Sequence, residues 1–88
     1  MNNIKISEID RKAIALNLKK VMGQVNSIME KVQNDNINDD ILTQLLAVKG
    51  GASRCCKDII IKGIMPNIHK YSQKELNEAL NILFKIDG

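Results

Sequence analysis

Residues 41–61 read ILTQLLAVKGGASRCCKDIII and carry the longest unbroken apolar period of this 88-residue chain. Apolar side chains recur there at alternating spacings of four and three, the rhythm of one helix face. They are Ile41, Leu45, Val48, Ala52, Cys55 and Ile59. A second line, made of Leu42, Leu46 and Ile60 with Ser53 and Cys56 between them, widens that face. The stretch therefore predicts a long helix that packs against more than one neighbour.

A first long helix is predicted before this stretch. Ser7 is a favourable N-cap, and Glu8 and Asp10 would lie in the first turn, where the helix dipole favours negative charge. Its apolar face has the same spacing and consists of Ile14, Leu18, Val21, Val25, Ile28 and Val32. The run NDNINDD at 34–40 favours a turn, so we expect the first helix to end near Gln33 and the second to begin near Asn38. Two long helices joined by so short a turn form an antiparallel hairpin.

A third, shorter helix is predicted after an interruption. Gly63 and Pro66 disfavour regular helix, so we expect an end or a kink there. Ser72 followed by Glu75 fits a capping box that opens the last helix. The apolar face of that helix consists of Leu76, Ala79, Leu80, Leu83 and Ile86. No stretch shows the alternation of a strand, which predicts an all-α fold with three helices.

Size and composition set further expectations. Residues 1–88 are expected to form one domain, and a core this small favours self-association. Both long helices have apolar flanks that one hairpin leaves uncovered, so we expect two hairpins to pair into a four-helix bundle. The opening residues are polar and charged and no 18-residue apolar run is present, so we expect a cytoplasmic protein with reduced thiols and no membrane partner.

Two segments resemble the signatures of a known family. LKKVMGQVNSI at 18–28 and LTQLLAVKGGA at 42–52 are similar to the CsoR/RcnR/FrmR repressors, bacterial transcriptional repressors that sense copper, nickel or cobalt, or formaldehyde. Gly23-Gln24, Thr43-Gln44 and the run AVKG at 47–50 are the most specific parts of the resemblance. It implies a disc-shaped, all-α tetramer, made as a dimer of dimers, that binds operator DNA without a helix-turn-helix. Ligand binding then releases the DNA.

The resemblance fails at the sensing residues of the family. Carried over position by position, the family's cysteine falls on Asn38, its histidine on Gly63, and its third ligand, Cys or His, on Asn67. An asparagine amide is a poor ligand for these metals and glycine has no side chain to offer. Loss of the cysteine also removes the nucleophile of the formaldehyde and persulfide sensors. We therefore predict no cofactor and no metal at these positions.

Three other side chains are candidates for a replacement site. Cys55 and Cys56 are adjacent, so on a helix their side chains diverge by about 100° and are poorly placed to chelate one metal. Cys55 lies in the apolar seam and is interpreted as a buried small hydrophobe. Cys56 lies on the flank, where it could meet a symmetry mate or react as a thiol. His69, the only histidine, follows the expected break and is interpreted as a solvated loop residue.

The DNA-binding interpretation rests on basic side chains on the outer faces of the first two helices. They are Arg11, Lys12, Lys19, Lys20, Lys49 and Arg54. Lys49 and Arg54 fall where the family has basic residues implicated in DNA contact, whereas Asn17 stands where the family commonly has arginine. For any single lysine a solvated face is the simpler interpretation, but a tetramer would multiply the net charge of +3 against the phosphates. No aromatic platform for unpaired bases is present, so double-stranded operator DNA is the expected partner.

Two other function classes are alternatives to a repressor. An enzyme is not predicted, because the chain has no phosphate loop, no metal quartet, and a lone histidine without a matching nucleophile and carboxylate. A helical oligomerisation or adaptor module, which has lost both ligand sensing and DNA binding, is the alternative function. Operator binding distinguishes this module from a repressor.

Overall fold

The computed structural model describes residues 3–87 and contains three α-helices joined by short irregular segments. They are α1 (Glu8–Gln33), α2 (Asp39–Ile59) and α3 (Gln73–Asp87). Between α2 and α3 lie a π-helix, η1 (Ile60–Ile64), and a 3-10 helix, η2 (Met65–Lys70). The described residues form no strand, which confirms the predicted all-α class with three helices.

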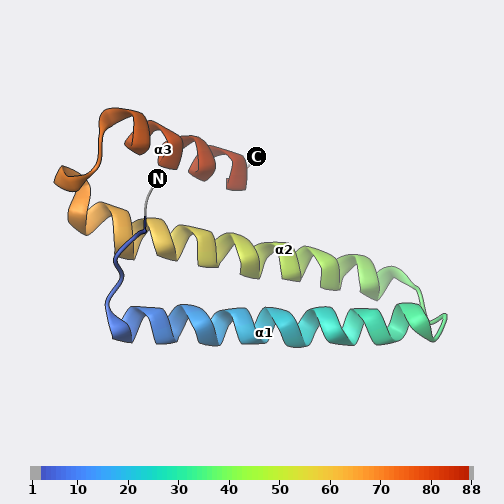
Figure 1. The fold of residues 1–88 in the computed structure, drawn as a ribbon. Helices are drawn as coiled ribbons and strands as arrows, with labels where there is room; N and C mark the ends of the chain where they lie inside the picture. Colours follow the sequence, from blue (N-terminus) through green and yellow to red (C-terminus); the bar gives the residue numbers. More distant parts are fainter. Residues whose placement is uncertain (1–2, 88) are drawn as a thin grey trace.

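The helices lie side by side in an elongated molecule of 51 × 28 × 16 Å. Figure 1 shows α1 and α2 as an antiparallel hairpin, with α3 running back along α2 on the side opposite α1. The segment before α1 crosses the end of α2 (Figure 1), and its Ile4 packs against a cluster that includes Ala79 of α3. Because α1 and α3 lie on opposite sides of α2, α2 is the central element.

Within residues 3–87, no helix is long and apolar enough to span a bilayer.

Short-range hydrogen bonds determine where α1 and α2 begin. The Ser7 hydroxyl oxygen accepts a hydrogen bond of 3.2 Å from the backbone N–H of Asp10. The Asn38 side-chain oxygen accepts one of 3.0 Å from the N–H of Asp40. Each side chain satisfies a donor that the first helical turn leaves unpaired. The predicted helix starts and the predicted end at Gln33 are confirmed.

The interruption after α2 takes a different form from the one expected at Gly63. Regular α-helix already ends at Ile59, and the chain continues as a π-helix in which the Met65 N–H donates to the Ile60 carbonyl. Pro66 has no N–H and its ring crowds the carbonyl four residues earlier, which favours this wider turn before it. The helical backbone breaks at Asn67, whose φ and ψ are −121° and 29°. The predicted kink is confirmed, but it begins three residues before Gly63.

The start of α3 is the predicted capping box. The N–H of Glu75 donates to the Ser72 hydroxyl at 3.2 Å, and the N–H of Ser72 donates to a Glu75 carboxylate oxygen at 3.0 Å. The backbone N–H of Ser72, and after it the Ser72 hydroxyl, lower the pKa of Glu75 below its usual 4.5, because hydrogen bonds to the carboxylate stabilise its ionised form. The pair therefore holds the first turn of α3 after the irregular η2 segment.

The core is small and extends from the hairpin into η1 and α3. The buried apolar residues are Ile14, Ile28, Ile41, Cys55, Ile60, Ile64 and Ala79. Four residues of the predicted inner faces, Leu18, Val25, Val32 and Leu45, remain 39–48% exposed, and Leu80 of α3 remains 50% exposed. The spacing marks these side chains as one face of each helix, but the contacts within a single chain do not bury them. A single chain therefore presents much uncovered apolar surface.

The segment before α1 completes the packing at the end of α2. Ile4 packs against a cluster of Ile60, Ile64 and Ala79 that joins η1 to α3. Gly63 is buried beneath this segment, and a Cβ atom there would overlap Ile4 and lie 2.9 Å from the Ile6 side chain. Glycine thus allows the N-terminal segment to approach the η1 backbone closely.

Candidate nucleic-acid interface

All six basic residues predicted to contact DNA are exposed on α1 or α2. The Lys12 ammonium group lies 3.3 Å from the Glu8 carboxylate one turn earlier. Because this ion pair is exposed to solvent, it contributes little to stability. Lys19 and Lys20 are neighbours on α1, so their side chains leave the helix about 100° apart. The structure therefore places the six on several faces rather than in a single patch.

Lys49 and Arg54 line one groove along α2, and we call it the basic groove. It has a volume of about 490 Å³ and is also lined by Lys57 and by the apolar side chains Leu46 and Ile61. Asp58 contributes the one carboxylate among its lining residues within the described chain. The helix brings these two cations, five residues apart in sequence, to a common surface beside α3. This groove is the most basic surface that the predicted residues build.

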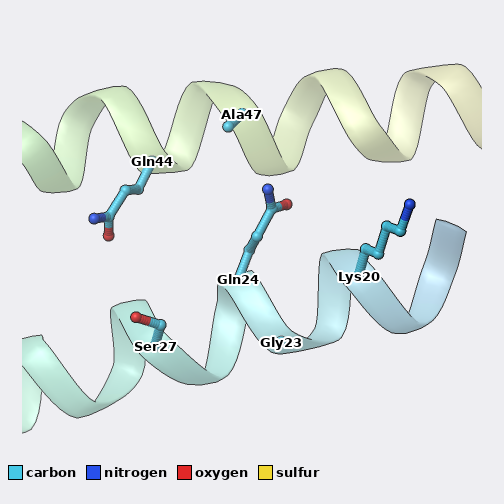
Figure 2. Close-up of a pocket in the computed structure, with 6 residues that line it drawn as sticks. All are labelled: Lys20, Gly23, Gln24, Ser27, Gln44 and Ala47. Atoms are coloured by element: carbon cyan, nitrogen blue, oxygen red, sulfur yellow. The ribbon is translucent and has the colours of Figure 1, made fainter.

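Lys20 belongs to a second groove, between α1 and α2, which we call the polar groove. It has a volume of about 550 Å³, and its lining residues come from both signature segments: Lys20, Gly23, Gln24, Ser27, Gln44 and Ala47. Figure 2 shows Gln24 reaching from α1 toward α2 and Gln44 reaching from α2 toward α1. The segments that carry the family resemblance therefore meet at one surface of the hairpin.

The three positions on which the resemblance places the family's sensing ligands serve the fold in this chain. Asn38 caps α2 through its side-chain oxygen. Gly63 lies beneath Ile4 and Ile6. Asn67 donates a hydrogen bond of 3.0 Å from its amide to the Gly63 carbonyl. These residues supply no thiolate and no imidazole, so the donor set does not fit a copper, nickel or cobalt ion.

The two cysteines face different surroundings. Cys55 is buried, with 4% of its surface exposed. This burial agrees with its interpretation as a small hydrophobic residue of the core. Cys56 is half-buried, packs against the Ile60–Ile64–Ala79 cluster, and lines an apolar cavity of about 120 Å³ together with Ile4. Both thiols are free. The structure therefore does not bring them together as a chelating pair.

His69 lies on the exposed surface of η2, outside the apolar cluster. Across residues 3–87, no group of three or more His, Cys, Asp or Glu side chains could hold a metal ion. His69, Cys55 and Cys56 are thus three separate groups, and a metal role for any of them remains a prediction.

Two features of the site could not be predicted from the sequence pattern. Gln24 and Gln44 belong to the signatures, but nothing in the sequence places them across one groove. The sequence pattern also does not predict the contact of Ile4 and Ile6 with Gly63, although the alternation of isoleucine and lysine in IKI at 4–6 indicates an extended segment with one apolar edge. Both relationships join residues far apart in the chain.

The family comparison agrees with the fold. The family model described as metal-sensitive transcriptional repressor matches residues 10–85, from the first turn of α1 into the last part of α3. Neither a comparison with curated proteins nor one with solved structures gave a match. The match covers most of the chain and confirms the resemblance to the CsoR/RcnR/FrmR repressors. The chain therefore belongs to the family of metal-sensitive transcriptional repressors.

Proposed function

We propose that this chain is a DNA-binding transcriptional repressor of the CsoR/RcnR/FrmR type that binds a double-stranded operator through α1 and α2. The observation that carries the proposal is the exposure of all six predicted basic side chains on these helices, two of them in the basic groove. Lysine and arginine at such a surface displace counterions from DNA, which supplies most of the sequence-independent affinity. Because a bacterial operator lies in the cytoplasm, we expect the protein to act there.

Self-association is part of the proposal. One chain leaves many apolar side chains of α1 and α2 exposed, and these side chains can form contacts with a second copy. They include Leu18, Met22, Val25, Met29, Val32, Leu42, Leu45 and Leu46. Pairing of two hairpins would cover the α1 side, and a dimer of dimers would carry four times the +3 charge of one chain. The assembly, rather than the single chain, is thus the DNA-binding unit.

Regulation is proposed to differ from that of the family. Asn38, Gly63 and Asn67 are engaged in capping and packing and offer no ligand for the family's metals. Operator release therefore does not depend on copper, nickel or cobalt at these positions. The repressor is either constitutive, controlled by a partner, or controlled through a cysteine, for which the half-buried Cys56 is the accessible candidate. No enzymatic step is part of the proposal.

The experiment that tests DNA binding compares two fourfold alanine variants of equal charge. The first replaces Lys19, Lys20, Lys49 and Arg54, and the control replaces the exposed Lys62, Lys70, Lys74 and Lys85. The probes are a duplex that the protein selects from a random pool and an unrelated duplex. We expect the first variant to bind both duplexes more weakly and with a flatter salt dependence, because each phosphate interaction that is removed lowers the slope by about 0.9. The control should change little.

Three outcomes would count against the proposal in different ways. Equal weakening of both variants would mean that net charge alone drives binding. Unchanged affinity of the first variant would move the DNA contact to other residues. A wild-type protein that self-associates but binds neither duplex at low salt would favour the oligomerisation or adaptor module.

A further inference from the structure

The polar groove lies between α1 and α2, and two of its lining residues are small. Gly23 and Ala47 lie on opposite helices, and a Cβ added to Gly23 would have no atom within 4 Å. Lys20, Gln24 and Ser27 follow one another at spacings of four and three along α1, so they form one row on its surface. Gln44 faces that row from α2 (Figure 2). The groove is thus bordered by polar side chains on both walls.

The lining of this groove is rich in hydrogen-bond donors. Lys20 carries an ammonium group, Gln24 and Gln44 each carry an amide NH₂ group, and Ser27 carries a hydroxyl. Among the described lining residues there is no carboxylate, whereas the basic groove contains Asp58. An anion entering the polar groove would therefore meet donors from two helices and one positive charge without a repelling group.

Gln44 supplies an independent observation. Its side-chain oxygen is shielded from solvent and has no hydrogen-bond partner. Most shielded polar atoms of folded proteins are paired, so an unpaired one marks a place where a partner is missing. Because no hydrogen bond holds this oxygen, the Gln44 side chain can change rotamer and present its NH₂ group to a ligand in the groove. The side chain is thus not committed to a contact within the chain.

We propose that the polar groove receives the sugar-phosphate backbone of the operator, with Lys20, Gln24, Ser27 and Gln44 donating to phosphate oxygens. The proposal rests on the DNA-binding function proposed above and adds uncharged residues to the contact surface. Half or more of the hydrogen bonds between proteins and DNA go to phosphate and sugar, and glutamine and serine make many of them. The small residues Gly23 and Ala47 in the lining leave room for the strand to approach both helices, whereas a base edge lies deeper inside the duplex. These contacts position the repressor without reading sequence.

The test uses single substitutions on the walls of the groove and matched ones on α3. Gln24→Ala and Lys20→Ala are compared with Gln73→Ala and Lys85→Ala, all at exposed positions. The probes are the duplex selected from the random pool and an unrelated duplex of the same length. We expect Gln24→Ala to weaken binding to both duplexes by the same factor, about tenfold for a hydrogen bond to a charged group, with an unchanged salt slope. Lys20→Ala should lower the slope by about 0.9.

A second substitution keeps the test informative if the missing hydrogen bond is compensated. Gln24→Glu places a carboxylate in the groove and should weaken binding to both duplexes more than Gln24→Ala, while Gln73→Glu should not. Helix content and thermal midpoint, measured in parallel, check that the variants fold. Unchanged binding of both Gln24 variants would overturn the proposal, and so would a loss confined to the selected duplex, which indicates base reading. If the wild type binds no duplex at all, the proposed DNA-binding function is wrong, and the role of the groove fails with it.

Discussion

Ile4 lies against Gly63 so closely that a Cβ atom on Gly63 would overlap the Ile4 Cγ2 methyl group. The resemblance places the family's sensing histidine at this glycine, and here the N-terminal segment occupies the space that a side chain would need. Ile6 lies on the same surface, 2.9 Å from the position of that Cβ. The segment before α1 thus covers the end of α2 as part of the apolar cluster around Ile60 and Ile64.

Gly63→Ala is expected to lower the free energy of unfolding by about 1–3 kcal/mol, the usual effect of an added methyl group in a packed site. The N-terminal segment must move to admit it, so amide exchange at 3–7 should become faster. Gly50→Ala is the control, because a Cβ there has no neighbour within 4 Å and alanine favours the helix. In an Ile4→Ala background the effect of Gly63→Ala should shrink. Additive effects of the two substitutions would contradict the contact.

The capping box should make α3 sensitive to acid. Its hydrogen bonds lower the pKa of Glu75 in the folded chain, so the stabilisation is present above the usual value of 4.5 and is lost as the pH falls through the lower folded value. Thermal unfolding followed from neutral to acidic pH should therefore bring the wild type closer to Glu75→Gln as the pH falls. A constant difference between the two proteins across this range would speak against a charged cap.

Ser72→Ala removes the other half of the same capping box. Because the hydroxyl accepts from the N–H of Glu75, its loss should destabilise α3 by about 1 kcal/mol, the typical effect of removing an N-cap. Ser72→Asp should retain most of the stability, since a carboxylate also accepts at this position. Amide exchange in the first turn of α3 is the local measurement, and unchanged exchange in Ser72→Ala would show that the cap is dispensable.

The uncovered α1 surface is expected to mediate self-association. Wild-type protein should sediment at micromolar concentration as a multiple of the 9.9 kDa chain. Val25→Glu combined with Met29→Glu places charges on this surface, which is partly exposed in one chain, and should shift the protein toward the monomer. Asn81→Glu, at an exposed polar position of α3, is the control. A folded wild-type monomer at this concentration would refute the expected assembly.

Copper, nickel and cobalt are not expected to act through the family positions. Reduced wild-type protein titrated with Cu(I) against a competing chelator should show no tight binding that depends on Asn38, Gly63 or Asn67, and no release of the selected duplex. Cys55→Ala and Cys56→Ala are measured beside it. If only Cys56→Ala loses a response, a relocated thiol site regulates the repressor. Tight binding with DNA release in the wild type and in both cysteine variants would contradict the prediction that the sensing site is missing.

The sequence by itself determined the elements whose signals are local. Ser7, Asn38 and Ser72 cap helices through bonds to residues two or three positions away, so the starts of α1, α2 and α3 could be predicted without any tertiary contact. The apolar periods likewise predicted the hairpin, and the signature segments predicted the family, because both depend on spacing within one stretch. The same periods do not predict how far Leu45 and Leu80 are buried, since a period identifies a face but not how much of it a neighbour covers.

Only the tertiary structure decided which distant residues meet. The covering of Gly63 by Ile4 joins positions 59 residues apart, and the polar groove sets Gln24 opposite Gln44 through the pairing of antiparallel helices. The change from α-helix to π-helix at Ile60 also accompanies packing against α3 and the N-terminal segment, which the turn residues Gly63 and Pro66 do not specify. Such contacts depend on the relative placement of whole helices. That placement is set by the summed packing of many side chains rather than by any single local preference.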